Sequence, residues 1–170
     1  MPVGAYMLSI LKRQASLLGP TFVEQHPDAW LVWEPGPWRP AVSVLSSNNE
    51  STRLPGQAGP SRPAGEDAIC FELTLRPGDT MLSVGRATDN DVVINDLTAS
   101  RDQFTLERSS GKWHLTVHGV PLTLNRQPVE QGKPLLLSSG DVLQAGEVLL
   151  TYLDAEGMAA RVERANRASG

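Results

Sequence analysis

The chain has 170 residues, 40% of them hydrophobic, and a formal net charge of −4. This composition can supply a buried core and argues against wholesale disorder. The acidic balance and the lack of a dense Lys/Arg run argue against nucleic acid as a partner.

The composition also limits which cellular compartment and which kinds of metal or membrane site are expected. The lone Cys70 excludes an internal disulfide and fits a reducing compartment. No apolar run approaches the roughly 20 residues of a membrane span, and the three histidines match no zinc motif. The basic pair Lys12-Arg13 follows the apolar N-terminal run, which is the reverse of a secretory signal. We therefore expect a cytoplasmic protein without a membrane partner, metal or cofactor.

Residues 1–45 form an N-terminal extension of unknown role. Apolar residues from Tyr6 to Leu18 recur near helical spacing, and Gly19-Pro20 ends that helix. A second helical turn is expected over residues 21–25, then a strand over residues 29–34; residues 41–45 suit another strand. The tryptophans at 30, 33 and 38 either form an exposed docking surface or pack against the rest of the protein, and we favour packing.

Two further segments lie before and after the largest region, residues 67–154. Residues 46–66 are dominated by Gly, Pro, Ser and Asn and are interpreted as a linker. Ser47, Ser51 and Thr52 make it a candidate phosphorylation target. Residues 155–170 form a tail that suits a short helix, which would be marginal without packing.

Residues 67–154 change to a period of two, with turn residues between short apolar segments. The pattern predicts strands over residues 69–75, 80–84, 92–94, 103–108, 112–117, 122–124, 134–137, 141–144 and 148–153. Many short strands at close turn spacing, with no helix between them, indicate an all-β antiparallel sandwich or barrel.

The run from Gly85 to Phe104 places Arg86 and Ser100 on two loops separated by one short strand. A guanidinium that is always charged, next to a small hydroxyl donor, suits a tetrahedral dianion. Further pieces follow in order: Asn90-Asp91-Val92, Ser100-Arg101, Asn125 and Gly140-Asp141.

Taken together, these pieces resemble the forkhead-associated (FHA) domain, over about half the chain. The resemblance implies an FHA-like antiparallel β-sandwich that binds phosphothreonine, here with an N-terminal helical extension and a tail helix. It also implies that Arg86 bonds the phosphate and that Ser100 completes the cradle; the alternatives are a solvated surface charge and a turn-capping serine.

The remaining candidate ligand residues are Arg101, Thr98 and Asn125. Arg101 either reaches the ligand or pairs with Asp96 or Asp91. Thr98 could donate to the ligand, although a solvent-facing threonine is the simpler interpretation. We expect Asn125, like Asn90 and Asp91, to order its own loop.

Two positions depart from the family pattern, so the ligand loop is diverged. Gln103 stands where the family has a scaffold histidine, and a glutamine supplies a similar donor, so we expect the fold to survive. Val120-Pro121-Leu122 replaces Asn-Gly-Thr, in a loop about two residues short. Val120 cannot grip a peptide main chain and Pro121 has no N–H. Either His118 or the Gly119 backbone substitutes, or His118 is a surface residue.

The sequence therefore favours a phosphothreonine-peptide binding module in Ser/Thr kinase signalling or protein assembly. Its partner would be a phosphorylated protein, such as a kinase or a kinase substrate. The missing asparagine should weaken affinity by up to roughly tenfold. The alternative is a degenerate FHA fold that serves as a phosphate-independent scaffold. We expect no enzyme, because no nucleophile motif or P-loop is present and Asp91 and Asp96 are ordinary turn residues.

Overall fold

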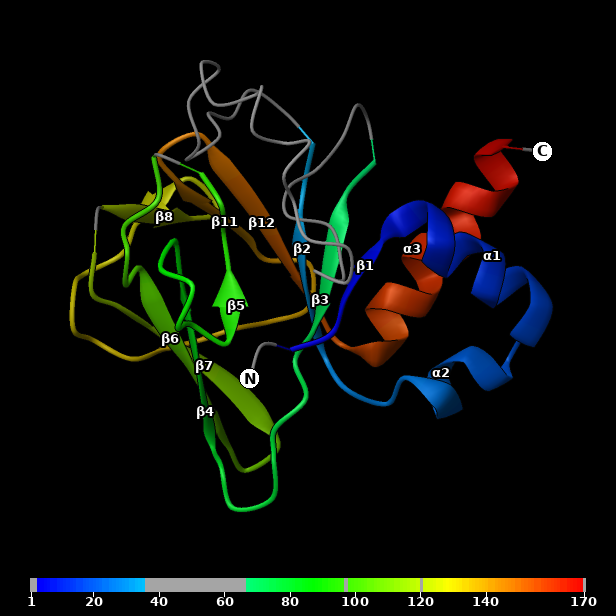
Figure 1. Ribbon diagram of the computed structural model, residues 1–170, viewed down its shortest axis with the longest axis horizontal. Helices are drawn as coiled ribbons and strands as arrows, with labels where there is room; N and C mark the ends of the chain where they lie inside the picture. The colour runs from blue at the N-terminus through cyan, green and yellow to red at the C-terminus, as the bar shows by residue number, and fades with distance from the viewer. Residues whose placement is uncertain (1–2, 36–66, 97, 120, 170) are drawn as a thin grey trace, which may run out of the picture.

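The computed structural model describes residues 3–35, 67–96, 98–119 and 121–169, with side chains as far as Arg164. The predicted linker at 46–66, the predicted strand at 41–45, Trp38 and Val120 lie outside these residues. Two β-sheets face each other and form a sandwich, and helices lie against one side of it (Figure 1). The expected fold class, an FHA-like β-sandwich with small helical parts, is confirmed.

The first sheet has seven strands in the order β1-β3-β2-β12-β11-β8-β9. Their bounds are β1 Ala5–Met7, β2 Trp30–Trp33, β3 Ile69–Glu72, β8 Leu122–Leu124, β9 Gln127–Pro128, β11 Val142–Ala145 and β12 Val148–Leu153. The second sheet has five strands in the order β10-β7-β6-β4-β5. They are β4 Met81–Gly85, β5 Val92–Val93, β6 Phe104–Ser109, β7 Lys112–Val117 and β10 Leu135–Leu136.

The N-terminal extension contributes directly to the first sheet. β2 lies between β3 and β12 and pairs antiparallel with both, so the sandwich extends beyond the boundaries of 67 and 154 that the sequence suggested. All four residues of β2 are buried, because the two faces of this strand enter different cores. Leu31 and Trp33 face the second sheet, whereas Trp30 and Val32 face the helices. The prediction that the tryptophans pack inside the protein is confirmed for Trp30 and Trp33.

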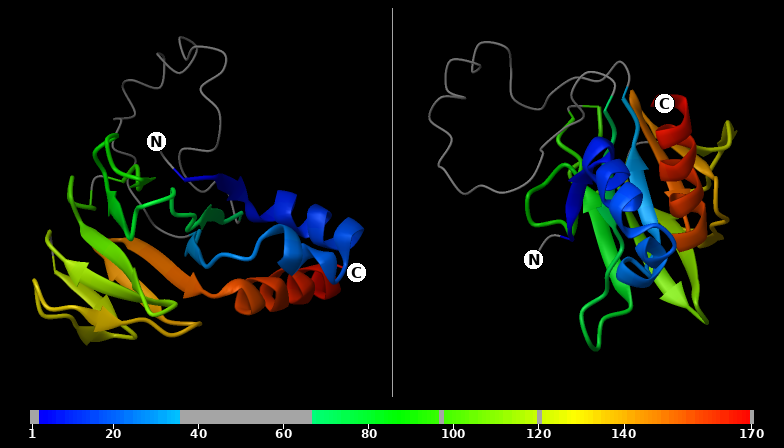
Figure 2. Two further views of the ribbon diagram at one scale, coloured as in Figure 1. Left: turned by 90° about the horizontal axis from the view of Figure 1, so that it is seen from below. Right: turned by 90° about the vertical axis from the view of Figure 1, so that its right-hand side faces the viewer.

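Three helices form a layer on the outer face of the first sheet, namely α1 (Leu8–Leu18), α2 (Thr21–Gln25) and α3 (Ala155–Ser169). Both views of Figure 2 show α1 and α3 side by side. The sequence did not show whether the tail helix would be packed. In the structure it is, because Met158 and Val162 are completely or almost completely buried. Arg161 of α3 adds a bidentate ion pair with Glu34, at 2.5 and 2.6 Å. Among the described helices, none has the length and apolar character needed to cross a membrane.

The strand predictions agree with the structure in most places. Three of them agree to the residue: 112–117, 122–124 and 148–153. β1 and β9 were not predicted, and β5 pairs parallel with β4 rather than antiparallel. The parallel pair arises because the loop after β4 folds back along that strand. Asp91 accepts a hydrogen bond from the backbone N–H of Ser83 at 2.8 Å, and the chain then turns so that Val92 runs beside Val84.

Candidate anion-binding site

Three loops come together at one end of the five-stranded sheet. Arg86 begins the loop after β4, Ser100 lies between β5 and β6, and Gly119 follows β7. The backbone N–H of Arg86 donates to the carbonyl of Ser100 at 2.9 Å, so the first two loops are directly joined. The side chain of Arg86 continues over the same loop, where Nε donates to the carbonyl of Ala99 at 3.2 Å. The structure therefore brings Arg86 and Ser100 together.

The third loop packs against Ser100 itself. A Cβ atom added at Gly119 would lie 2.4 Å from Oγ of Ser100, so any larger residue would displace the hydroxyl. The backbone N–H groups of His118 and Gly119 both donate to the carbonyl of Gln103, at 2.9 and 3.0 Å. The sequence offered the backbone of Gly119 as a substitute for the missing asparagine, and the structure adds its close packing against Ser100.

The charge of Arg86 is available to a ligand. Its side chain is half-buried, and within the described part of the chain no carboxylate forms an ion pair with it. A half-buried guanidinium without a described counterion, beside a serine, can donate its remaining N–H groups to an anionic oxygen.

The side chain of Asn90 joins the loop after β4 to the loop that carries Ser100, as expected for a loop-ordering residue. The side chain is buried, and Nδ2 donates to the carbonyls of Ala87 and Arg101 at 2.9 and 2.7 Å. Gly85 allows this close approach, because a Cβ there would lie 2.1 Å from the carbonyl oxygen of Arg101. The bonds of Asn90 and the close contact of Gly85 with Arg101 therefore hold Arg86 against the Ser100 loop.

Gln103 occupies the position of the family histidine and supports the Ser100 loop. It is buried, and its Oε1 accepts a hydrogen bond from the backbone N–H of Ser100 at 2.9 Å. The fold survives this replacement, as expected, although the bond to Ser100 uses the glutamine as an acceptor and not as a donor.

Thr98 and Asn125 are committed to contacts within the protein. The hydroxyl of Thr98 donates to the buried carboxylate of Asp96 at 2.5 Å and accepts from the backbone N–H of Glu147 at 2.9 Å. Asn125 has a left-handed backbone conformation with φ of 51° at the β8–β9 turn. Its amide bonds Asp141 and the N–H of Val142, which ties this turn to β11.

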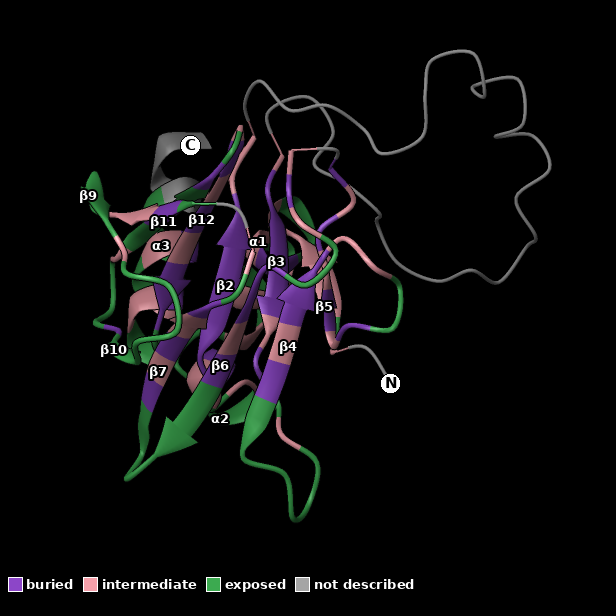
Figure 3. Cartoon of the chain, turned by 90° about the vertical axis from the view of Figure 1, so that its left-hand side faces the viewer, coloured by how far each residue is buried: buried purple, intermediate pink, exposed green. Residues whose placement is uncertain are grey.

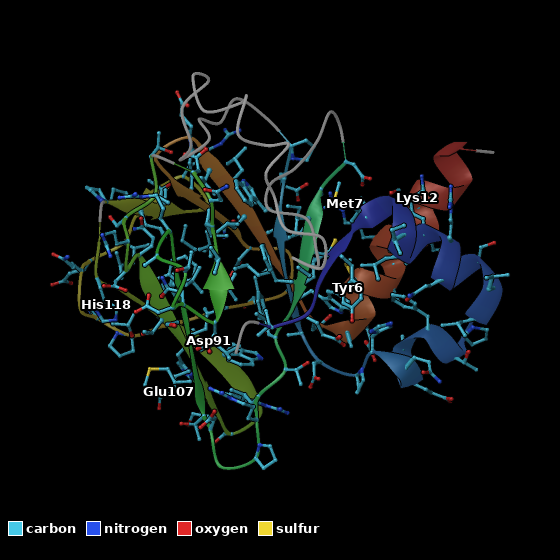
Figure 4. The ribbon with its side chains drawn as sticks, viewed as in Figure 1. Tyr6, Met7, Lys12, Asp91, Glu107 and His118 are labelled. Atoms are coloured by element: carbon cyan, nitrogen blue, oxygen red, sulfur yellow. The ribbon has the colours of Figure 1, made fainter. Side chains whose placement is uncertain are left out.

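Arg101 and His118 lie at the exposed rim of the loops. Arg101 forms no ion pair in the described structure, so the alternative in which it pairs with Asp96 or Asp91 is wrong. The imidazole Nε2 of His118 lies 3.1 Å from the hydroxyl of Thr105. Figure 4 shows His118 and Asp91 well apart from Tyr6 of β1 and Lys12 of α1.

Comparisons with known proteins agree with this architecture. The family model described as FHA domain matches residues 82–146. The N-terminal FHA domain of Rad53p from S. cerevisiae, solved with a phosphothreonine peptide, is 15% identical at a TM-score of 0.50, over 79% of this chain and 98% of that one. Rad53 1–466 with AMP-PNP is 16% identical at a TM-score of 0.51, over 81% of this chain and 32% of that one. No curated protein sequence matches the chain. The chain therefore contains an FHA domain, whose matched region includes Arg86, Ser100 and Arg101.

Proposed function

We propose that this chain binds phosphothreonine peptides through Arg86 and Ser100 and acts as an interaction module in Ser/Thr kinase signalling or protein assembly. The observation that carries the proposal is the Nε–carbonyl bond between Arg86 and Ala99, at 3.2 Å. This bond holds a guanidinium without a described counterion over the loop that carries Ser100.

The phosphate is the part of the ligand that this geometry suits best. A phosphate dianion gains most from charge-assisted hydrogen bonds, each contributing about 1.5–3 kcal/mol, and Arg86 can supply them. Ser100 adds a hydroxyl, and Arg101 adds a second cation at the exposed rim. The relative from S. cerevisiae was solved in complex with a phosphothreonine peptide, which supports this class of ligand. Thr98 and Asn125 take supporting positions in the proposal, because their side chains are already bonded within the protein.

Selectivity for the peptide around the phosphothreonine should be poor. The third loop carries Val120 at the position where the family has an asparagine that grips the ligand main chain, and Pro121 follows it. The partner is proposed to be a phosphorylated protein in the cytoplasm, either a Ser/Thr kinase or a substrate of one, and no catalytic step is assigned to the chain.

Replacing the arginine tests the proposal. A degenerate peptide library with a fixed phosphothreonine identifies the best-bound sequence, which is then titrated by calorimetry as phosphorylated and unphosphorylated forms. We expect Arg86→Ala to weaken binding of the phosphorylated peptide by at least about tenfold, because it removes a charge-assisted bond. Arg13→Ala, which removes an exposed arginine of α1, is the matched control and should leave the affinity unchanged.

The opposite outcome would favour a scaffold that does not read phosphate. In that case the phosphorylated and unphosphorylated peptides would bind equally, and Arg86→Ala would behave like Arg13→Ala. The diverged third loop is the feature that makes this alternative worth testing.

A further inference from the structure

A cavity opens at the end of the sandwich opposite the Arg86 loops. Its volume is about 340 Å³, and it lies between the start of β2, the β6–β7 turn and the junction of β12 with α3. β6 starts next to Gln103, beside the Ser100 loop, and ends at Ser109 next to this cavity. At about 3.3 Å per residue, the strand separates the two places by roughly 16 Å. Figure 3 shows β6 and β7 buried in mid-sheet and exposed toward their turn.

Two aromatic side chains form the inner wall of the cavity. Tyr152 and Trp113 are 6% and 4% exposed, respectively, and both belong to the core between the sheets. Neither the hydroxyl of Tyr152 nor the indole N–H of Trp113 has a hydrogen-bond partner in the described structure. Neither atom is both closed off from solvent and without a hydrogen-bond partner, so each keeps some exposure. Both residues line the cavity, so a ligand that enters it can hydrogen-bond the Tyr152 hydroxyl and the Trp113 N–H.

The rim of the cavity carries an excess of negative charge. Asp28, Asp154 and Glu156 line it together with one cation, Arg108. Within the described residues, none of these four groups forms an ion pair. Oδ1 of Asp154 accepts hydrogen bonds from the N–H of Gly157 at 2.6 Å and from Ser139 at 3.2 Å, and its other oxygen makes no described bond. The field of this carboxylate reaches the inner wall, since burial and then Asp154 raise the pKa of Tyr152 to about 12.

Aromatic walls beneath carboxylates suit an organic cation better than a metal ion. Hard divalent cations need about six oxygen ligands, and the described residues contain no cluster that could hold one. An alkylammonium can instead lay its apolar stem on an indole and gain a cation–π contact. Its N–H groups can then donate to the Tyr152 hydroxyl and to the rim carboxylates.

We propose that this cavity, formed by Trp113, Tyr152, Asp28, Asp154 and Glu156, is a second binding site that takes the side chain of a lysine from a partner protein. The site is independent of the phosphate-dependent function, because it shares no residue with the Arg86 loops. A partner could therefore be held at both ends of the sandwich.

The indole N–H of Trp113 provides a direct reporter. The full chain has four tryptophans, so a ¹H–¹⁵N spectrum of the labelled protein shows few indole signals, and Trp113→Phe assigns the relevant one. The probes are N-acetyl-lysine methylamide and N-acetyl-norleucine methylamide, which share a four-carbon stem and differ in the ammonium group. We expect the lysine probe to shift the Trp113 signal in a saturable manner and the norleucine probe to leave it in place.

Charge variants make the test sharper. Asp28→Asn with Glu156→Gln should weaken the lysine probe by about three- to tenfold, whereas Arg108→Gln, which removes the like charge, should strengthen it by about two- to threefold. Thermal melting confirms that each variant is folded. The proposal is overturned if norleucine shifts the signal as much as lysine, if lysine produces no shift, or if the double variant binds lysine as the parent does.

Discussion

Asn90 is the residue on which the geometry of the Arg86 and Ser100 loops most depends. It is 4% exposed and bonds two carbonyls, one in its own loop and one in the Ser100 loop. The side chain of Arg86 also joins these two segments, through its bond to the carbonyl of Ala99. Asn90 is buried and supplies two bonds between the loops, whereas Arg86 is half-buried and its side chain supplies one.

We expect Asn90→Ala to lower the free energy of unfolding by about 1–3 kcal/mol, because it removes two hydrogen bonds made by a buried side chain and leaves the carbonyls of Ala87 and Arg101 with their backbone donors alone. Urea unfolding measures the loss. Phosphopeptide affinity should fall in the same variant, as the two loops are no longer tied. Asn125→Ala, at an exposed turn, is a useful comparison for a loop-ordering asparagine outside the site. A change below about 0.5 kcal/mol in Asn90→Ala would contradict the assigned role.

At the scale of elements, α3 is held by its buried face and by one ion pair. Met158 and Val162 pack with Leu11 of α1 and Phe22 of α2 on the outer face of the first sheet. Arg161 reaches Glu34 beyond the end of β2, and Glu34 also accepts a hydrogen bond from Thr151 at 2.6 Å. The tail is thus bound to three segments that are distant in sequence.

Met158→Ala should therefore destabilise the whole protein by about 2–5 kcal/mol, the usual cost of a cavity at a fully buried methionine. Arg164→Ala, an exposed position on the same helix, should change stability by less than about 0.5 kcal/mol. Thermal and urea unfolding compare the two. Equal stability of both variants would mean that the helix is not docked as described. Where Met158→Ala remains folded, its phosphopeptide affinity should match the parent, because α3 lies away from the Arg86 loops.

The whole molecule is organised around a sheet that is buried on both faces. β2 and β3 separate two cores, one between the sheets and one beneath the helices. The second core contains Cys70, which is fully buried on β3. Burial raises the pKa of its thiol far above the ordinary value, and the nearby charge of Arg161 only partly opposes this. The thiolate is the reactive form, so Cys70 should be inert while both cores are closed.

We expect a thiol reagent such as a disulfide dye to modify Cys70 at neutral pH no faster than the protein opens, and immediately in concentrated urea. The absorbance of the released dye measures both rates. Cys70→Ala serves as the blank, since the chain has no other cysteine. Rapid labelling of the folded protein would contradict the packing of the helical layer. Met158→Ala should label faster than the parent, because it loosens the same core.

Local patterns in the sequence were enough to predict many of the strands of this protein and its family resemblance. Alternating residues bounded by Gly and Asn turns predicted β7, β8 and β12 to the residue, because side-chain alternation and turn conformation are properties of a few adjacent residues. The order of Arg86, Asn90 and Ser100 likewise indicated an FHA domain, and the two loops do meet.

Contacts between segments that are distant in sequence were revealed only by the tertiary structure. The place of β2 in mid-sheet depends on Ile69 and Leu150 as pairing partners, and nothing near Trp33 encodes either one. The sequence left Thr98 as either a ligand donor or a solvent-facing residue, but the backbone N–H of Glu147, 49 residues away, donates to its hydroxyl. The cavity at Trp113 and Tyr152 exists because strands of different sheets end together beside the start of α3. Each feature depends on the assembly of the two sheets, because burial and pairing are shared between segments that have no local relation.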